Sequence, residues 1–216
     1  MFKERFEISR GWGETKRALL KQLMLLYWQY DTEPQFAGTE DVPTAVVQNS
    51  PEDLLLKVYD QLKKRALASY DWRSTIRYVS ITPTEPEGGT GDTRYKYSAP
   101  VPSDFLKVVG YWADSARQVP AHNCVDTVGR TMRTNMQSFV LGYVADVKET
   151  EFDPWLDDYL MIFIAAEASN IGGVSNDWKN FLMTKAQNDW FDLTNKDYEM
   201  AQRDEVSASI HQFEFH

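Results

Sequence analysis

The sequence is poor in cysteine, histidine and positive charge. Its 216 residues include one Cys and three His, too few for an internal disulfide or for a zinc site built from several cysteines. The 23 Lys and Arg are outnumbered by 32 Asp and Glu, which gives a formal charge of −9. Clustered basic side chains supply most of the affinity for phosphate backbones, so this composition argues against a protein that grips DNA.

Long hydrophobic runs are also missing. The most apolar early stretch, Leu23 to Trp28, follows Lys21 and has six residues, far short of the roughly 20 that span a bilayer. The start of the chain, Met1 to Arg10, is too charged for a signal peptide. We therefore expect a soluble protein made in a reducing cytoplasm, with no membrane segment.

Aromatic residues, by contrast, are plentiful. The 7 Trp, 11 Tyr and 11 Phe make 29 rings, more than one core of this size obviously needs. Large aromatic side chains are common in protein interfaces. We therefore expect some of these rings to lie between proteins.

The spacing of apolar residues predicts four helices. The first covers residues 14–30, and the second starts at Ser50-Pro51, where Ser is a cap and Glu52 and Asp53 follow in the first turn. The third begins at Asp153-Pro154 and ends at Gly172-Gly173. The fourth begins at Asn176, with apolar residues at spacings of three or four.

The segment between the second and third helices has no pattern of helix length and favours strands. The expected strand segments are residues 72–81, 95–97, 108–112, 131–135 and 138–144. We expect the last two to form a hairpin, residues 103–106 to form a short helical turn, and residues 84–92 to form a loop.

These elements predict an α+β fold that is mainly α: a four-helix bundle with a β-rich insertion between helices 2 and 3 and a C-terminal extension. The predicted parts are an N-terminal leader (1–13), helices 1 and 2 (14–71), the β-rich insertion (72–147), helices 3 and 4 (148–203) and a C-terminal docking tail (204–216).

Three short segments contain residue types that catalytic or binding sites use. His122 to Asp126 includes Cys124, but a thiolate, a base and an acid usually come from distant parts of a chain, so a polar loop is favoured. Glu87 to Asp92 is rich in glycine but lacks the Lys-Ser/Thr of a phosphate loop. An acidic run offers oxygen ligands for a cation, yet its place at a helix start explains it more simply. That run consists of Glu149, Glu151, Asp153, Asp157 and Asp158. No catalytic residue, metal or cofactor is predicted.

Two groups of aromatic and apolar residues are candidates for contacts with partners. The last seven residues place Ile210, Phe213 and Phe215 where chain ends are usually polar, so the segment either docks on a partner or folds back on its own domain. Trp155, Trp178 and Trp190 lie at helical spacings, either in a core or between subunits.

The order of several segments resembles the head-tail adaptor proteins of tailed bacteriophages, called tail tubular protein A in short-tailed phages. The matching segments are residues 66–73, 95–106, 143–146, 152–155 and 165–168. The similarity covers roughly Ser50 to Gly173. The leader of residues 1–13 and the loose turn at residues 30–34 depart from the family pattern.

The resemblance implies a structural virion protein, assembled in the host cytoplasm, and not an enzyme. Twelve copies would form a ring between the portal protein and a tail nozzle or tail tube protein, with the chain ends reaching the portal. DNA would pass through the lumen without specific binding, because twelve copies at −9 sum to −108 and repel it. Basic residues such as Lys16, Arg17 and Lys21 would face partners.

Two other functions are also compatible with the sequence. The first is a small soluble α+β enzyme that uses Cys124, His122 or the acidic run. The second is a monomeric module whose acidic surface binds a basic partner.

Overall fold

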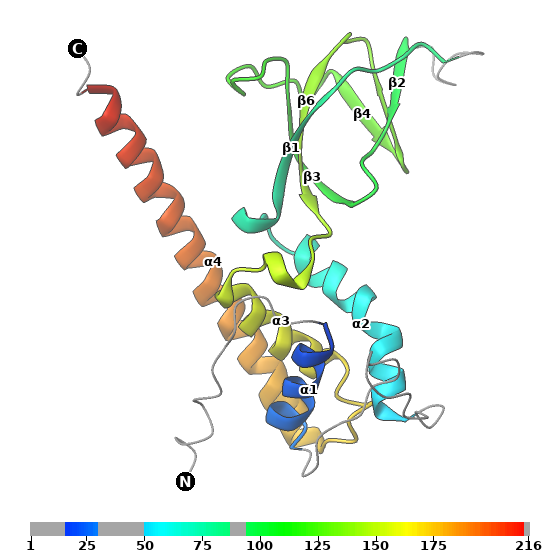
Figure 1. Cartoon of the computed structure of the whole chain (residues 1–216), viewed down its shortest axis with the longest axis vertical. Coiled ribbons are helices and arrows are strands. Elements are labelled where there is room, and N and C mark those ends of the chain that lie inside the picture. Colours follow the sequence, from blue (N-terminus) through cyan, green and yellow to red (C-terminus); the bar gives the residue numbers. More distant parts are fainter. Residues whose placement is uncertain (1–15, 30–49, 87–93, 214–216) are drawn as a thin grey trace. The chain divides into compact units, whose positions relative to one another are not determined.

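The computed structural model describes residues 16–29, 50–86 and 94–213. It divides into two compact units, a helical unit from residues 1–66 and 148–216 and a β unit from residues 67–147. Figure 1 labels the helices and most of the strands of both.

The helical unit contains four described helices of very different length. They are α1 (Lys16–Tyr27), α2 (Pro51–Ala68), α3 (Pro154–Glu167) and α4 (Asn176–Phe213). Helix α3 packs against both α1 and α4. Leu20 and Leu23 of α1, Leu160 and Ile164 of α3, and Leu182 of α4 are fully buried, so these three helices share one apolar core.

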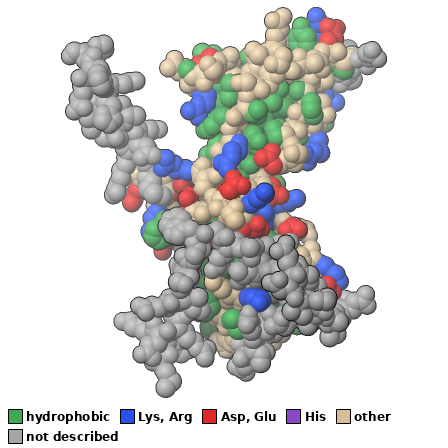
Figure 2. All heavy atoms as spheres, viewed as in Figure 1, with side chains coloured by type: hydrophobic (Ala, Val, Ile, Leu, Met, Phe, Trp, Pro, Cys, Tyr) green, Lys and Arg blue, Asp and Glu red, His purple; other side chains and the backbone are tan. Residues whose placement is uncertain are grey.

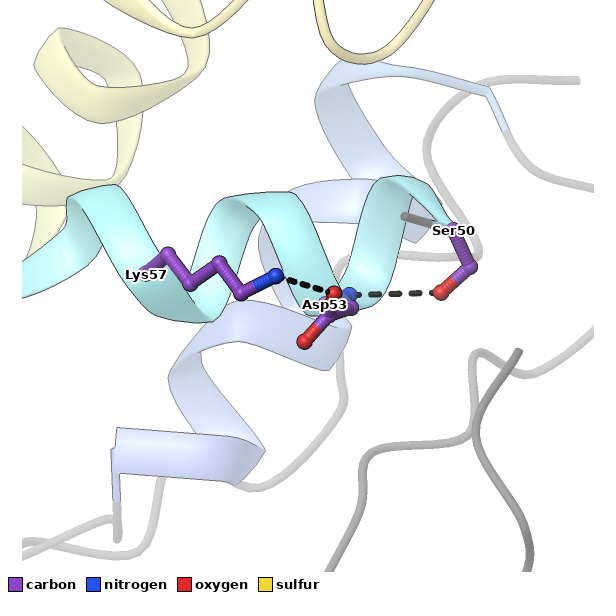
Figure 3. Close-up of polar contacts among 3 residues, drawn as sticks. All are labelled: Ser50, Asp53 and Lys57. Carbon is purple, nitrogen blue, oxygen red and sulfur yellow. Dashed lines mark hydrogen bonds and ion pairs between the residues drawn. The ribbon is translucent and has the colours of Figure 1, made fainter. Parts of the chain in front are cut away.

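The start of α2 confirms the predicted cap. The backbone N–H of Asp53 donates to Ser50 Oγ at 3.3 Å, and Pro51 is the first helical residue. Lys57 Nζ donates to the Asp53 carboxylate at 2.6 Å, one turn further along (Figure 3). A capping side chain and an (i, i+4) ion pair therefore stabilise the first two turns.

Two tryptophans hold the end of α1 in place. The Trp28 indole N–H donates to the carbonyl oxygen of Ala165 at 3.1 Å, and that of Trp178 donates to the carbonyl oxygen of Tyr27 at 2.6 Å. A Cβ added to Gly172 would lie 2.3 Å from the Trp28 ring. Only glycine therefore leaves room for the buried Trp28 side chain.

The β unit contains two antiparallel sheets of three strands each among its described residues. One sheet has the order β1 (Ile76–Ile81), β6 (Phe139–Ala145) and β3 (Phe105–Trp112), and the other has the order β2 (Tyr97–Pro100), β5 (Thr131–Thr134) and β4 (Val125–Val128). All seven residues of the central strand β6 are buried. Met132, Leu141 and Val144 are almost completely buried and belong to this unit's core.

The predicted four-helix bundle with a β-rich insertion is wrong. The described strands form two sheets in a compact unit with its own buried residues. The helices do not match a bundle either, because α4 has 38 residues and α1, α2 and α3 have 12, 18 and 14. At 1.5 Å per residue α4 is roughly 57 Å long, so a helix as short as α3 can flank only part of it.

The predicted hairpin is also wrong. Strand β5 pairs with β2 and β4, whereas β6 pairs with β1 and β3. Strands next to each other in sequence therefore lie in different sheets. Which strands pair depends on which of their faces become buried. The short distance in sequence between two strand segments does not reveal this.

Several element boundaries differ from the prediction. A short 3-10 turn precedes β1, and β3 begins at Phe105, where a helical turn was expected. Residues 125–128 form β4, although the polar-loop interpretation extended to Asp126. Gly129 has a φ of +61° between β4 and β5, a conformation that glycine adopts without strain.

The boundaries of α3 and α4 differ as well. Helix α3 ends at Glu167, before the predicted Gly172-Gly173 stop. Ser175, and not Asn176, caps α4, because its Oγ accepts the backbone N–H of Trp178 at 3.3 Å. Helix α4 continues through residues 204–213, where a tail outside the helix was expected. The segment 176–213 contains neither Gly nor Pro, so nothing local stops the helix.

Candidate functional site

An apolar groove lies between α3 and α4, with a volume of about 280 Å³. Its lining residues are Tyr159, Phe163, Ala166 and Glu167 from α3 and Met183, Ala186, Gln187, Trp190 and Phe191 from α4. Glu167 is the one charged residue among them, and its carboxylate accepts from Arg65 at 2.9 Å. The groove therefore presents mainly ring and aliphatic surface, which is typical of a site for an apolar partner.

Large apolar side chains extend this surface along α4. Met183, Phe191 and Tyr198 are each about half exposed or more. Their spacings of eight and seven residues place them on one side of the helix. Trp155 at the start of α3 is also half exposed, and Lys196 Nζ lies 4.9 Å from its ring centre. Exposed apolar residues gathered in this way mark an interaction surface.

The three predicted interface tryptophans have different surroundings. Trp155 is exposed, and Trp190 is half-buried in the groove. Trp178 is half-buried as well, but it stacks on Phe181 with ring centres 4.8 Å apart and bonds to Tyr27. Trp178 therefore has a structural contact inside its own unit. The interface role of all three stays a prediction.

The predicted docking tail falls at the edge of the described part. Ile210 and Phe213 lie in the last turns of α4, but their side chains, and all of Phe215, are outside the described residues. The side chains of Lys16 and Arg17 are outside them too. The docking role stays a prediction.

A buried polar cluster joins α2 to the segment before α3. The Tyr59 hydroxyl donates to Glu149 Oε1 at 3.0 Å, and Lys63 Nζ lies 3.6 Å from the same oxygen. The side chains of Lys63 and Glu149 are 9% and 16% exposed. Lys63 Nζ also lies 6.0 Å from the centre of the Phe152 ring. The Glu149 carboxylate therefore interacts with both the Tyr59 phenol and the Lys63 ammonium group, and all three groups are largely shielded from solvent.

This cluster changes the interpretation of the acidic run. Asp153 occupies the N-cap position of α3 and Asp157 lies in its first turn, as the helix-start interpretation expects. Glu151 accepts the backbone N–H of Lys148 at 3.4 Å. Glu149 instead pairs with residues about 90 positions earlier, which no local pattern signals.

Burial, followed by the nearby Glu149 carboxylate, raises the pKa of the Tyr59 hydroxyl well above its ordinary value of about 10. The phenol therefore stays protonated and continues to donate its hydrogen bond in alkaline solution. In the unfolded chain the same hydroxyl loses its proton near its ordinary pKa.

Stability should consequently fall as the pH rises above about 10, because the folded state then holds a proton that the unfolded state has lost. We expect Tyr59→Phe to lower the free energy of unfolding at neutral pH by about 1 kcal/mol and to flatten this alkaline decline. Urea unfolding at a series of pH values measures both effects, with Tyr198→Phe as the exposed control. An unchanged alkaline slope in Tyr59→Phe would contradict the expectation.

The residues of the catalytic alternative lie around the start of β4. Cys124 is exposed in the turn that precedes the strand, and Asp126 is within it. The ring of His122 lies 6.4 Å from that of Trp112 and 6.5 Å from that of Tyr111. Among the described residues, no three His, Cys, Asp or Glu side chains group as a metal site would require. The segment Glu87 to Asp92 lies outside the described residues.

The net negative charge comes from the part of the sequence outside the β unit. Residues 67–147 contain 8 basic and 8 acidic side chains, and the rest of the chain contains 15 basic and 24 acidic ones. The β unit is therefore neutral, and the net charge of −9 belongs to the sequence of the helical unit. No described helix combines the length and the apolar character that crossing a membrane requires.

No protein-family model matches the chain, and no curated protein matches it in sequence.

Proposed function

We propose that the chain is a head-tail adaptor of a tailed bacteriophage, a structural virion protein that forms a ring between portal and tail. The observation that carries the proposal is the apolar surface formed by the α3–α4 groove and the exposed side of α4. The residue pattern between Ser50 and Gly173, which resembles that of head-tail adaptors, suggests the class of protein. The apolar surface gives neighbouring copies a face on which to pack.

A ring needs two different faces on each subunit, because every copy contacts its two neighbours in the same head-to-tail way. The groove, with Trp190 and Phe191, is a suitable face for one neighbour. Burying half-exposed rings such as Trp155 and Phe191 against the next copy would stabilise the ring by about 0.7 to 1.5 kcal/mol for each side chain, half of what burial of a fully exposed side chain contributes. Twelve copies of the 25.0 kDa chain would make a ring of about 300 kDa.

The uneven charge supports a channel through which DNA passes without specific binding. Because the net charge belongs to the helical unit, a lumen lined by that unit would repel DNA. The end of α4, with Ile210 and Phe213, followed by Phe215, would dock on the portal. A tail nozzle or tail tube protein would bind the other side. No cofactor and no catalytic step belong to this proposal.

The test is assembly in the presence of the candidate portal protein. We expect Phe191→Asp to abolish the ring, since it places a charge in the groove, and Phe181→Asp to leave the ring intact. Phe191 and Phe181 are 52% and 50% exposed on the same helix, but only Phe191 lines the groove. Negative-stain images and mass photometry of portal mixed with each variant give the readout. Rings that form equally with Phe191→Asp would refute the role of the groove.

A further inference from the structure

We propose that the β unit binds an extended proline-rich segment of a partner protein on the face of its β1–β6–β3 sheet that carries Tyr78 and Trp112. This inference concerns a surface outside the α3–α4 groove and does not depend on ring formation. Figure 2 shows hydrophobic side chains gathered on the visible face of the β unit. Tyr78, Val119 and Val128 are the large hydrophobic residues described as exposed in this unit.

Two glycines form the floor of the proposed site. Tyr78 of β1 is in register with Gly142 of β6, and Gly142 is in register with Gly110 of β3. A Cβ on either glycine would lie 2.7 Å from the ring of Trp112. Because neither residue has a side chain, the indole lies across the two strands. Its ring centre is 5.7 Å from that of Tyr78.

A loop after β3 places a cation beside these rings. The Arg117 guanidinium carbon lies 4.0 Å from the centre of the Tyr78 ring. The Asp114 carboxylate accepts the backbone N–H groups of Gln118 and Val119 at 3.0 and 2.8 Å and so holds the loop in shape. With His122 beside Trp112, the surface is a row of two aromatic rings between Arg117 and an imidazole.

The polar atoms of this row point to an acceptor-rich ligand. Neither the Tyr78 hydroxyl nor the Trp112 indole N–H makes a hydrogen bond to another described residue, and both can donate. The Asp114 carboxylate, the nearest strong acceptor in the loop, is already used by backbone N–H groups. Arg117 covers one face of the Tyr78 ring, so the site offers the remaining ring surface of Tyr78 and Trp112 together with these donors.

Proline matches this combination better than other residues do. It has a carbonyl acceptor and no N–H donor, and its ring packs on aromatic faces. Proline-rich segments form polyproline II helices without internal hydrogen bonds, so they lose little conformational entropy when they dock on aromatic grooves. Arg117 would favour an acidic residue in the segment. A nucleic acid is a poorer match, because the β unit has no net positive charge.

The test is calorimetric titration of the full chain with an oligoproline peptide that ends in glutamate. We expect saturable binding, and we expect Tyr78→Ala to weaken it by about tenfold or more. The control is Tyr198→Ala, which removes an exposed tyrosine from α4 and should bind as the unchanged chain does. Near-ultraviolet circular dichroism checks that Tyr78→Ala keeps its fold.

A second variant shows whether weaker binding of Tyr78→Ala is caused by a folding defect. Tyr78→Phe keeps the ring and loses only the hydroxyl donor, so its binding should lie between that of the unchanged chain and that of Tyr78→Ala. A Gly-Ser peptide of the same length and charge should not bind. Equal binding of both peptides, preferential binding of oligothymidylate, or no saturable binding of oligoproline would each overturn the proposal.

Discussion

Replacement of Glu149 by alanine is expected to lower the free energy of unfolding of the helical unit by about 3 kcal/mol. The carboxylate accepts from Tyr59 and lies 3.6 Å from Lys63 Nζ, and both charged side chains are mostly buried. Alanine would leave the Lys63 ammonium group in a weakly solvated place without this carboxylate. The cost of such a change exceeds the strength of the original ion pair, because the remaining charge is poorly hydrated.

Denaturant unfolding followed by far-ultraviolet circular dichroism measures the effect. Glu151→Ala is the matched control, since Glu151 belongs to the same short turn but is exposed, and its replacement should cost only about 0.5 to 1 kcal/mol for the lost hydrogen bond to the Lys148 N–H. Glu149→Gln keeps an oxygen acceptor for Tyr59 but loses the charge, so its stability should be intermediate. Similar losses for Glu149→Ala and Glu151→Ala would show that the buried cluster contributes little.

Replacement of Gly172 by alanine is expected to lower the free energy of unfolding by about 3 kcal/mol, at the upper end of the range for overpacking. The new Cβ would meet three atoms of the Trp28 ring at 2.3 to 2.7 Å. Trp28 is 4% exposed and its indole N–H bonds to Ala165, so the ring cannot move aside without breaking that bond. Moving it would also disturb the contact between α1 and α3.

Gly173→Ala separates this steric effect from backbone strain. Gly173 has a φ of +63° but open space around its Cβ position, so alanine there should cost only about 1 kcal/mol. Thermal unfolding of both variants gives the comparison. The double variant Gly172→Ala with Trp28→Leu should recover part of the stability in a double-mutant cycle. A smaller loss for Gly172→Ala than for Gly173→Ala would contradict the packing argument.

The starts of two helices could be predicted because the signals are local. Ser50 and Pro51 at α2, and Asp153 and Pro154 at α3, stand within one turn of the groups they affect. A cap acts through hydrogen bonds and dipoles that reach only that first turn. The predicted starts of α2 and α3 were therefore right. The predicted length of α4 was wrong, because no local signal marks where that helix ends.

The sheets could not be predicted because strand pairing is not local. The residue pattern showed that residues 131–135 and 138–144 favour strands, but not that they belong to different sheets. Strand β6 is buried along its whole length between β1 and β3, and β3 lies about 30 residues earlier in the chain. Only the packing of both faces selects that arrangement.

The candidate sites show the same difference between local signals, which the sequence reveals, and long-range contacts, which it does not. Trp190 was predicted as an interface candidate because it is a tryptophan at helical spacing. Tyr159 and Phe163 also line the groove, but helical spacing alone cannot distinguish them from core residues. His122 was considered with Cys124, whereas its observed neighbours are the rings of Tyr111 and Trp112. Residue type suggested which side chains interact, but not with which partners.

The sequence by itself determined the net charge, the starts of α2 and α3 and the surplus of aromatic rings, because these depend on composition or on contacts within one turn. The tertiary structure decided that the charge belongs to the helical unit, that Glu149 meets Tyr59 and Lys63, and that Trp112 lies over two glycines. The contact of Glu149 with Tyr59 joins residues 90 positions apart, and that of Trp112 with Gly142 joins residues 30 positions apart. Such contacts form only when burial of apolar surface outweighs the entropy of closing the long loops between them.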